Sequence, residues 1–492
     1  MNYVTSYYYV LIAIVFILYY ALPLKIRWLA LLAGSLAFYL LLWQKRTVVL
    51  LFFLTILISC LCGIVLGRLS DRSRRSLKPD KILRRFALIL SLILCSLPFL
   101  AAKAAGFACD FHFDFLSSQS LLIPLGCSFY TMQIIAYLVD VSKGSVTPQY
   151  NILKYTLFLT FFPQVLQGPI PRYDDLEPQL LQGHRFDHRE VFRGMELIVW
   201  GWFLKFMIAE KAKLFVNAVF DGTEAAEGFT VLLAGILYSL QLYADFLACT
   251  TFSQGVAGLF GIHLAGNFDH PYFAASIKDF WRRWHQSLSL WLRDYIYIPL
   301  GGNRKGKARK YLNLMITFAV SGIWHGNGVK FLFWGLLHGV YQLVGEWTRP
   351  VKTRIYNRLA MPENSRPWKW IRIPCTFFFV MLGWVILRAS SLKQGLSMVR
   401  SILTAQNARV LTDGSLLTMG LDGKDWNVLI VSLAALFAVS YLQEKRGLIR
   451  DLIARQHLLV RWVIYLAAIT GIAVFGTYGQ GYDAGAFIYE GF

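Results

Sequence analysis

Long uncharged, apolar stretches recur along the chain and dominate its pattern. Most of them approach the roughly 20 residues needed to cross the hydrocarbon core of a bilayer. The shorter ones fit re-entrant or broken helices, because backbone polar groups inside a membrane must find partners within the protein. The pattern predicts an all-α polytopic integral membrane protein with about ten to twelve membrane segments. The stretches are residues 1–24, 28–44, 47–67, 86–102, 115–139, 155–171, 228–244, 311–329, 426–443 and 462–482.

Composition agrees with a membrane environment. Hydrophobic residues make up 56% of the chain and charged residues only 16%, whereas about a quarter of the residues in a soluble domain are charged. No basic residue precedes the first stretch and no small-residue cleavage site follows it, so we expect a retained helix rather than a signal peptide. The seven cysteines show no metal-binding spacing. We interpret them as small buried hydrophobes and predict no metal site.

The net charge of +21 predicts the topology. Residues 68–85 are strongly basic, and the positive-inside rule places them in the cytosol, together with residues 303–310, 349–372 and 445–461. Both chain ends are then outside a multi-pass protein of the cytoplasmic membrane. Because this membrane bias accounts for the charge, nucleic-acid binding is not predicted.

No long linker, repeat or low-complexity tract divides the chain, so residues 1–492 are interpreted as a single integral membrane domain. Residues 245–347 differ from the rest because polar, charged and aromatic residues crowd into membrane-compatible sequence. Ionisable residues inside a membrane are costly and usually functional. We therefore expect the chemistry in this part of the chain.

Residues 277–299 have the periodicity of an amphipathic helix lying in the membrane interface. Periodicity alone favours an interfacial role for His285, which lies beside the apolar seam and would bond a backbone carbonyl. The seam is formed by Trp281, Trp284, Leu288, Trp291 and Tyr295.

A Gly-rich basic loop follows this segment and contains Arg304, Lys305 and Lys307. It lacks the spacing of a true P-loop, but its charge would attract an anionic donor from the cytosol. Next, residues 311–345 are flanked by basic residues at both ends and interrupted by Trp-His-Gly-Asn-Gly, which predicts a hairpin or a re-entrant pair with His325 at its bend. A titratable residue at a helix break in a membrane is a functional candidate.

Other candidates are weaker. His184 and His188 have the spacing of metal ligands but lie in a polar loop, where a solvated face is the simpler interpretation. Asp245 would orient a histidine or pair with an arginine. His338 lies on the second leg of the predicted hairpin and is less marked. No nucleophile elbow, Walker loop or dinucleotide fingerprint appears.

Several of these segments together resemble bacterial membrane-bound O-acyltransferases. They are FFPQVLQGPIPRY (161–173), DFWRRWHQSLSLWLRDYIYIPLGGNRKG (279–306), SGIWHG (321–326), FWGLLHG (333–339) and the ending FIYEGF (487–492). The resemblance is to the alginate O-acetyltransferase branch, with the teichoic acid D-alanyl transferase as a nearer cousin than the eukaryotic members. One departure is Thr251, which stands where the family often has a second acidic residue.

The resemblance implies a helical, funnel-shaped fold with a catalytic core at about residues 160–347. It implies that His325 is the principal catalytic residue and His285 its partner, acting without a bound cofactor. The expected donor is acetyl-CoA, or an acyl carrier protein thioester. The expected partners are the bilayer, a glycan of the cell envelope or an exported polysaccharide as acceptor, and an extracellular relay protein. Two other classes stay open, a polysaccharide or ion transporter and a non-catalytic subunit of an export complex.

The first prediction concerns topology. Because three apolar stretches precede the basic residues 68–85, both chain ends should be outside the cell. Single cysteines introduced at Asn2 and Phe492 should react with a membrane-impermeant thiol reagent in intact cells. Protection of either cysteine until the membrane is permeabilised would refute this topology.

Overall fold

The computed structural model describes residues 5–42, 46–75, 81–110, 126–165, 167–222, 226–358, 365–405 and 407–478. Every regular element within these ranges is a helix, which confirms the all-α class. The two chain ends and the motif at residues 487–492 lie outside them. Seven described helices are long and apolar enough to cross a membrane. They are α2 (Arg27–Leu42), α3 (Arg46–Arg75), α4 (Lys81–Asp110), α10 (Gly228–Leu259), α16 (Arg366–Arg388), α18 (Gly423–Arg446) and α20 (Leu458–Phe475).

Several of the other predicted membrane segments form shorter, broken or more polar helices. The apolar stretch at residues 155–171, for example, is helical only in its first part and continues as a buried, non-helical segment. This is why fewer helices meet the length criterion than the sequence pattern suggests. The helices concerned are α1 (Ser6–Ala21), α5 (Cys127–Lys143), α6 (Ile152–Thr160), α13 (Gly306–His325) and α14 (Val329–Trp347). Helix α8 (His188–Trp202) lies outside the predicted stretches.

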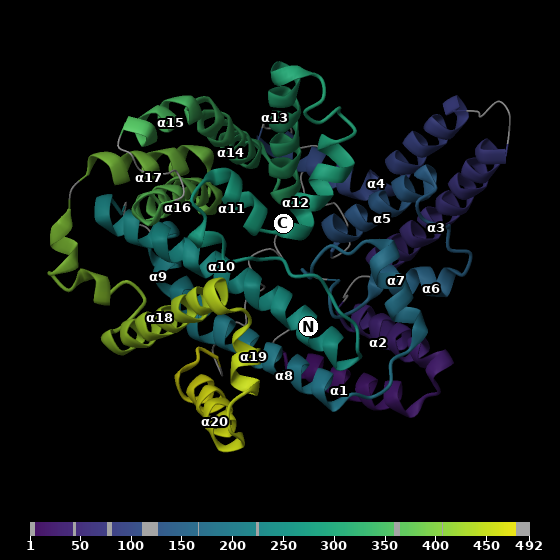
Figure 1. The fold of residues 1–492 in the computed structure, drawn as a ribbon, viewed down its shortest axis with the longest axis horizontal. Coiled ribbons are helices and arrows are strands. Elements are labelled where there is room, and N and C mark those ends of the chain that lie inside the picture. The colour runs from purple at the N-terminus through teal and green to yellow at the C-terminus, as the bar shows by residue number, and fades with distance from the viewer. Residues whose placement is uncertain are drawn as a thin grey trace.

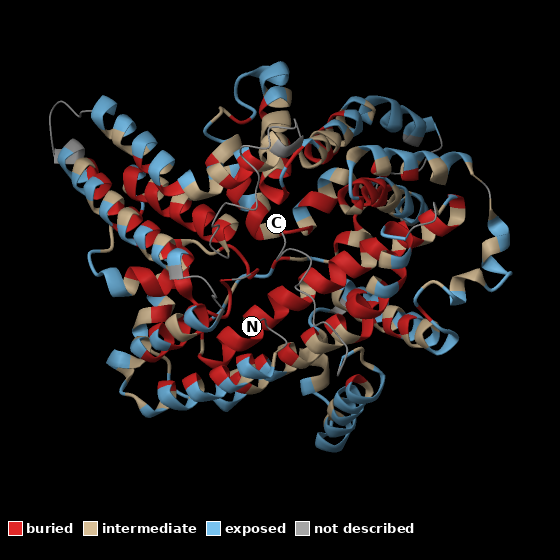
Figure 2. Cartoon of the chain, turned by 180° about the vertical axis from the view of Figure 1, so that it is seen from behind, coloured by how far each residue is buried: buried red, intermediate tan, exposed pale blue. Residues whose placement is uncertain are grey.

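Helix α10 runs through the middle of the molecule (Figure 1) and is buried along most of its length (Figure 2). It is apolar on all sides, as expected for a helix surrounded by protein. Its closest partner is α8, because glycines allow their backbones to meet. A Cβ atom added at Gly194 would lie 2.7 Å from the carbonyl oxygen of Gly255. Small residues at such crossings are typical of membrane helices.

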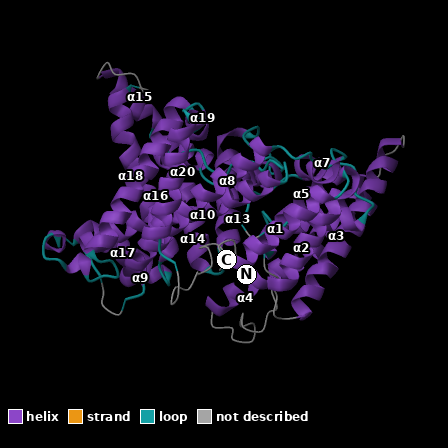
Figure 3. Cartoon of the chain, turned by 90° about the horizontal axis from the view of Figure 1, so that it is seen from below, coloured by secondary structure: helices purple, strands orange, loops and turns teal. Residues whose placement is uncertain are grey.

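Two groups of helices from different parts of the chain lie at opposite ends of the molecule (Figure 3). Helices α3, α5 and α7 (Tyr173–Gln182) lie towards one end, and α15 (Arg349–Arg358), α16 and α17 (Leu392–Thr404) towards the other. Helices α10, α13 and α14 lie between them. The remaining described helices are α9 (Glu210–Phe220), α11 (Ile277–Arg283), α12 (Gln286–Leu292) and α19 (Ile449–Ala454). The short turns are η1 (Leu24–Ile26), η4 (Phe203–Ala209), η5 (Pro271–Phe273), η6 (Arg293–Tyr297), η7 (Ala408–Leu411) and η8 (Ser415–Leu417).

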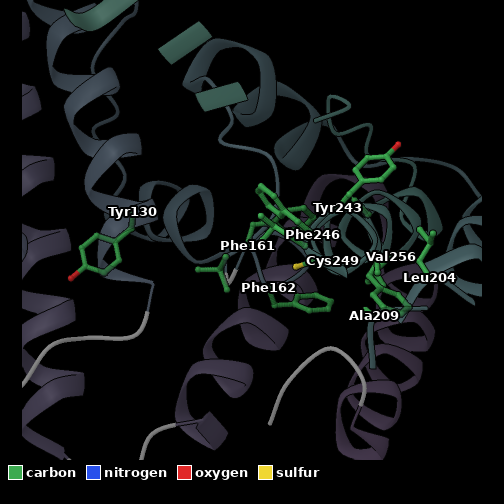
Figure 4. Close-up of a cluster of buried hydrophobic side chains, with 14 of the residues drawn as sticks. Tyr130, Phe161, Phe162, Leu204, Ala209, Tyr243, Phe246, Cys249 and Val256 are labelled. Carbon is green, nitrogen blue, oxygen red and sulfur yellow. The ribbon is translucent and has the colours of Figure 1, made fainter. Parts of the chain in front are cut away.

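The non-helical segment that follows α6 is held inside the core. Figure 4 shows its residues Phe161 and Phe162 beside Phe246 and Cys249 of α10. The backbone N–H of Phe162 donates to the hydroxyl of Ser35 on α2 at 3.2 Å. Such internal partners are what allow irregular backbone to exist at membrane depth.

A buried ion cluster joins α10 to the chain that follows α8. There the helix widens into a π-helical turn, η4 (Phe203–Ala209), which carries Lys205. The Lys205 ammonium lies 2.7 Å from Asp245 on α10 and 2.7 Å from Glu210 on α9. Asp245 therefore pairs with a lysine, rather than with the arginine considered from the sequence. A buried charge needs such a partner.

Helices α13 and α14 form the predicted hairpin, and glycines bring its two legs together. A Cβ atom added at Gly335 of α14 would lie 2.3 Å from the Phe318 carbonyl oxygen and 3.0 Å from the Gly322 backbone. Both obstacles are backbone atoms of α13, so a side chain at this point forces the legs apart.

The second prediction tests this crossing. Gly335→Ala should lower the thermal unfolding temperature in detergent, at a cost of about 1–3 kcal/mol, because overpacking at the backbone outweighs the gain in helix propensity. The matched control is Gly345→Ala on the same helix, where no atom lies within 4 Å of the added Cβ. This control should be neutral or slightly stabilising. Equal unfolding temperatures for the two variants would contradict the proposed crossing.

Candidate active site

His325 is the last residue of α13, at the bend of the hairpin. The chain leaves the helix in an extended conformation at Gly326 and turns at Gly328, where φ is +100°. The imidazole of His325 is only 1% exposed. Its ring centroid lies 4.8 Å from that of Trp324 and 5.0 Å from that of Trp334. The structure thus places His325 at the predicted helix break, between two indole rings.

His285 lies at a second helix break, which the sequence analysis did not predict. The segment 277–299 is divided into α11 (Ile277–Arg283), α12 (Gln286–Leu292) and a π-helical turn, η6 (Arg293–Tyr297). The expectation of one continuous interfacial helix was wrong, because its aromatic seam is buried inside the protein. The backbone at His285 adopts the left-handed conformation. Its φ of +45° is rare for a residue with a side chain.

Asn267 holds the chain in this unusual conformation. Its backbone carbonyl accepts a hydrogen bond from the N–H of Gln286 at 2.9 Å. Its side-chain oxygen accepts another from the N–H of Ser287 at 3.1 Å. These are orphan donors at the start of α12. The strain at His285 is thereby offset by a neighbour nearly twenty residues away, and strained residues of this kind cluster at functional sites.

The two breaks bring the two histidines together. The ring centroids of His285 and His325 are 6.5 Å apart. At this separation one oxygen atom can lie at about 2.8–3.0 Å from a nitrogen of each ring. His285 is 1% exposed, and the edge of its ring packs against Phe246 of α10 at a centroid distance of 4.7 Å. The pair is therefore shielded from water and able to act on one hydroxyl group.

Several buried polar side chains have no hydrogen-bond partner among the described residues. Within the described part of the chain, neither ring nitrogen of His285 has a hydrogen-bond partner, and the same holds for the side-chain amides of Gln164 and Gln167. Native proteins leave few buried polar atoms unpaired. The ring nitrogens of His285 are therefore candidates for bonding a group that is not part of the described chain.

Comparison with known proteins decides the family. The model of the membrane-bound O-acyltransferase family matches residues 31–392, which is most of the chain. The chain belongs to this family. It is therefore a multi-pass membrane protein with acyltransferase activity. The resemblance inferred from the sequence is confirmed.

Individual relatives of this acyltransferase agree with the family match. A probable alginate O-acetylase, AlgI, of Pseudomonas aeruginosa is 33% identical over 387 residues, which cover 76% of this chain and 69% of the relative. A peptidoglycan O-acetyltransferase of Helicobacter pylori is 33% identical over 318 residues, covering 59% and 58%. A teichoic acid D-alanyltransferase of Bacillus subtilis is 28% identical over 286 residues, covering 54% and 69%.

A cavity of about 280 Å³ lies next to the His285 break of the acyltransferase. Its polar lining includes Gln286 and Ser287, which directly follow His285, and Arg172. Ser287 also accepts a hydrogen bond from the Ile170 N–H at 3.1 Å, which ties the Gly-Pro-Ile-Pro segment to the break. The cavity thus connects two of the segments that carry the family resemblance.

Charged groups surround the part of this cavity that Arg172 and Tyr295 line. Arg172 forms an ion pair with Asp294, and the hydroxyl of Tyr295 donates to Asp140 of α5. Arg172, Asp294 and Asp140 each have a polar partner. This part of the cavity is therefore polar, and its charges nearly cancel.

The three residues predicted to bind the donor lie elsewhere. Arg304, Lys305 and Lys307 are exposed, at the start of α13. Because α13 has 20 residues, this loop and His325 are separated by about 30 Å of helix. The structure does not bring the basic loop into contact with the histidine pair, and donor binding by the loop stays a prediction.

His338 is buried close to the pair but is separated from it by an indole ring. Its centroid is 5.0 Å from that of Trp334, on which His325 also packs. It contacts Trp281 at 5.1 Å as well. Neither of its ring nitrogens has a partner among the described residues. Its surroundings are aromatic, which fits the lower rank given to it from the sequence.

The remaining sequence candidates lie away from the pair. His188 is exposed, and His184 bonds the Gln179 carbonyl at 2.8 Å. Among the described residues, one group of side chains has the spacing of metal ligands, namely Asp269, His270 and Glu444. The guanidinium of Arg283 already lies 3.0 Å from the Glu444 carboxylate. The protein itself therefore supplies the positive charge that a metal ion would bring to this group.

Sequence reasoning missed Asn267, Gln164 and Gln167. Asn267 lies in a loop without a motif, and only its contacts reveal that it holds His285. The two glutamines lie within an apolar stretch, where a buried amide is itself a signal of function.

Proposed function

We propose that this acyltransferase moves an acetyl group from a cytosolic thioester to a hydroxyl group of an exported polysaccharide or cell-envelope glycan. The observation that carries the proposal is the pair of buried histidines, His285 and His325, whose ring centroids are 6.5 Å apart. The names of two relatives, an alginate O-acetylase and a peptidoglycan O-acetyltransferase, support acetyl as the group transferred and a glycan as the acceptor.

The chemistry needs only one base and one hydrogen-bond donor. Neutral His325 takes the proton of the acceptor hydroxyl while the hydroxyl oxygen attacks the thioester carbonyl carbon. The tetrahedral intermediate then collapses, the C–S bond breaks, and the proton passes to the departing thiolate. His285 donates a hydrogen bond to the oxyanion, an interaction that is strongest in a site without water. No serine or cysteine nucleophile takes part.

The placement of the cavity supports delivery of the thioester from the cytosol. The Asp140 end of the cavity lies near the end of α5, and shortly afterwards Pro148 packs against Gly67 of α3. From Gly67 the chain leads into the basic residues 68–85, which the positive-inside rule assigns to the cytosol. A thioester entering on this side would reach His285 first, because Gln286 and Ser287 line the cavity.

The acceptor and partners belong to the same proposal. A glycan on the outer side would meet the thioester at the histidine pair, between the two membrane faces. The bilayer is the protein's solvent, and an extracellular relay protein would carry the acetyl group onward where the acceptor lies beyond reach. Acetyl-CoA is the proposed donor, with an acyl carrier protein thioester as the alternative.

The third prediction concerns the donor. If the basic loop draws in the phosphates of coenzyme A, replacing Arg304, Lys305 and Lys307 together with alanine should raise the donor KM. The increase should be larger at low ionic strength, where charges are less screened. Initial rates of purified protein in nanodiscs, measured with labelled acetyl-CoA, give this constant.

The matched control removes three exposed positive charges from α15, namely Lys352, Arg354 and Arg358. These residues belong to another basic stretch assigned to the cytosol, so the same loss of charge should leave the donor KM unchanged. Equal donor constants for both triple variants, at every salt concentration, would remove the loop from the donor site.

The fourth prediction decides the mechanism. His325→Ala should insert and fold, but transfer should fall by roughly 100-fold or more, the scale of losing positioned general-base catalysis. His285→Ala should also reduce turnover. The double variant should lose less than the product of the two single losses, because residues that act as one unit are not additive.

His338→Ala is the packing control, since it removes an equally buried imidazole from the same aromatic surroundings. It should lower stability at least as much as His325→Ala while retaining most of the turnover. A folded His325→Ala protein that transfers acetyl groups at the wild-type rate would sink the general-base mechanism.

A further inference from the structure

A single lysine from the N-terminal half of the chain reaches the catalytic helix break. Lys103 lies in the C-terminal third of α4 and is 6% exposed. Its ammonium donates a hydrogen bond to the backbone carbonyl of Trp324 at 3.1 Å. Trp324 is the residue before His325, so the lysine bonds the backbone that carries the proposed base. Within the described part of the chain, no carboxylate lies within the 4.0 Å of an ion pair with this ammonium.

This hydrogen bond has a clear physical role. The last four carbonyl groups of a helix have no partner within the helix, and α13 ends at His325. The partial negative charge at a helix C-terminus also favours a nearby cation. The Lys103 ammonium supplies both the hydrogen bond and the positive charge at the end of α13.

Other residues on the same face of α4 contact the same break. A Cβ atom added at Gly106, one turn beyond Lys103, would lie 2.2 Å from Cβ of Asn327. One turn before Lys103, Phe99 lies under its ammonium at 5.3 Å from the ring centroid. Phe99 also packs against the cluster of buried residues that contains Trp324. Residues 99, 103 and 106 thus form one stripe, as the helical repeat requires, and this stripe seats the segment 324–327.

Burying an ammonium group at this depth costs free energy. Burying a cation without a carboxylate costs several kcal/mol in membrane-like surroundings. An apolar side chain at position 103 would leave the Trp324 carbonyl without this donor.

We propose that Lys103 is a positioning residue for acyl transfer, which holds the end of α13 so that His325 faces His285. The inference rests on the proposed function. It assigns to α4 a part in the active site that its apolar sequence does not suggest. Lys103 contacts the backbone of the hairpin rather than the substrates, so its loss affects turnover and not binding.

The test is steady-state kinetics of Lys103→Met in nanodiscs, with acetyl-CoA as donor and a short glycan that wild-type protein acetylates as acceptor. Methionine keeps the length of the side chain but removes the donor and the charge. We expect kcat to fall roughly 10- to 100-fold, the scale expected when a catalytic group moves by about 1 Å. Both KM values should stay unchanged.

The matched control is Lys330→Met. The ammonium of Lys330 likewise donates to carbonyls at a helix C-terminus, those of Leu387 at 3.1 Å and Ala389, but at the end of α16. This control should keep kcat within about twofold of wild type, because the helix that it caps carries neither histidine of the pair. Equal kcat values for the two methionine variants would overturn the inference. So would a higher KM with an unchanged kcat, which would indicate substrate binding.

Two further variants keep the test decisive if Lys103→Met does not fold. Lys103→Gln retains a hydrogen-bond donor and should give an intermediate kcat, whereas wild-type kcat in this variant would count against the inference. Gly106→Ala should lower kcat from the next turn of the same stripe. Failure of the proposed function would look different, since wild-type protein would then transfer no acetyl group or His325→Ala would remain active.

Discussion

The need to satisfy backbone polar groups away from water governs this structure more than any other constraint. In hydrocarbon, an unpaired N–H or C=O costs several kcal/mol, so a helix can break only where protein supplies the partners. The two breaks that carry His285 and His325 are both inside the protein. At the first, Asn267 receives the free N–H groups at the start of α12. At the second, Lys103 donates to a free carbonyl at the end of α13.

Positions far apart in the chain are therefore needed to bring the two histidines together. The breaks depend on contacts from α4 and from the loop before α11, and α10 provides the wall on which His285 packs. Glycines determine how near the elements approach, because the crossing of α13 and α14 brings backbone atoms within reach of each other. The histidines supply the chemistry, and the neighbouring residues determine the distance between their rings.

Hydropathy and charge predicted the membrane class and the hairpin bend at His325 correctly, since both follow from runs of apolar residues and their basic flanks. The division of residues 277–299 was not predictable in this way. Periodicity describes which side chains share a face, and it stays nearly unchanged when one residue in the middle adopts a positive φ. The pairing of His285 with His325 came from family resemblance, because no sequence spacing indicates that residues forty positions apart will meet. The contact of Lys103 with the break was equally hidden.

The left-handed backbone at His285 has a consequence for how this position can change over time. Two independent demands meet there, one for an imidazole and one for a residue that tolerates a φ of +45°. Asparagine, aspartate and glycine meet the second demand best and lack the ring, whereas β-branched residues meet neither. Most one-step replacements would thus lose chemistry and backbone conformation together. Substitution at position 285 is thus restricted both by the chemistry and by the backbone. A descendant that has lost the imidazole would be expected to carry asparagine or glycine there, because these residues keep the left-handed turn.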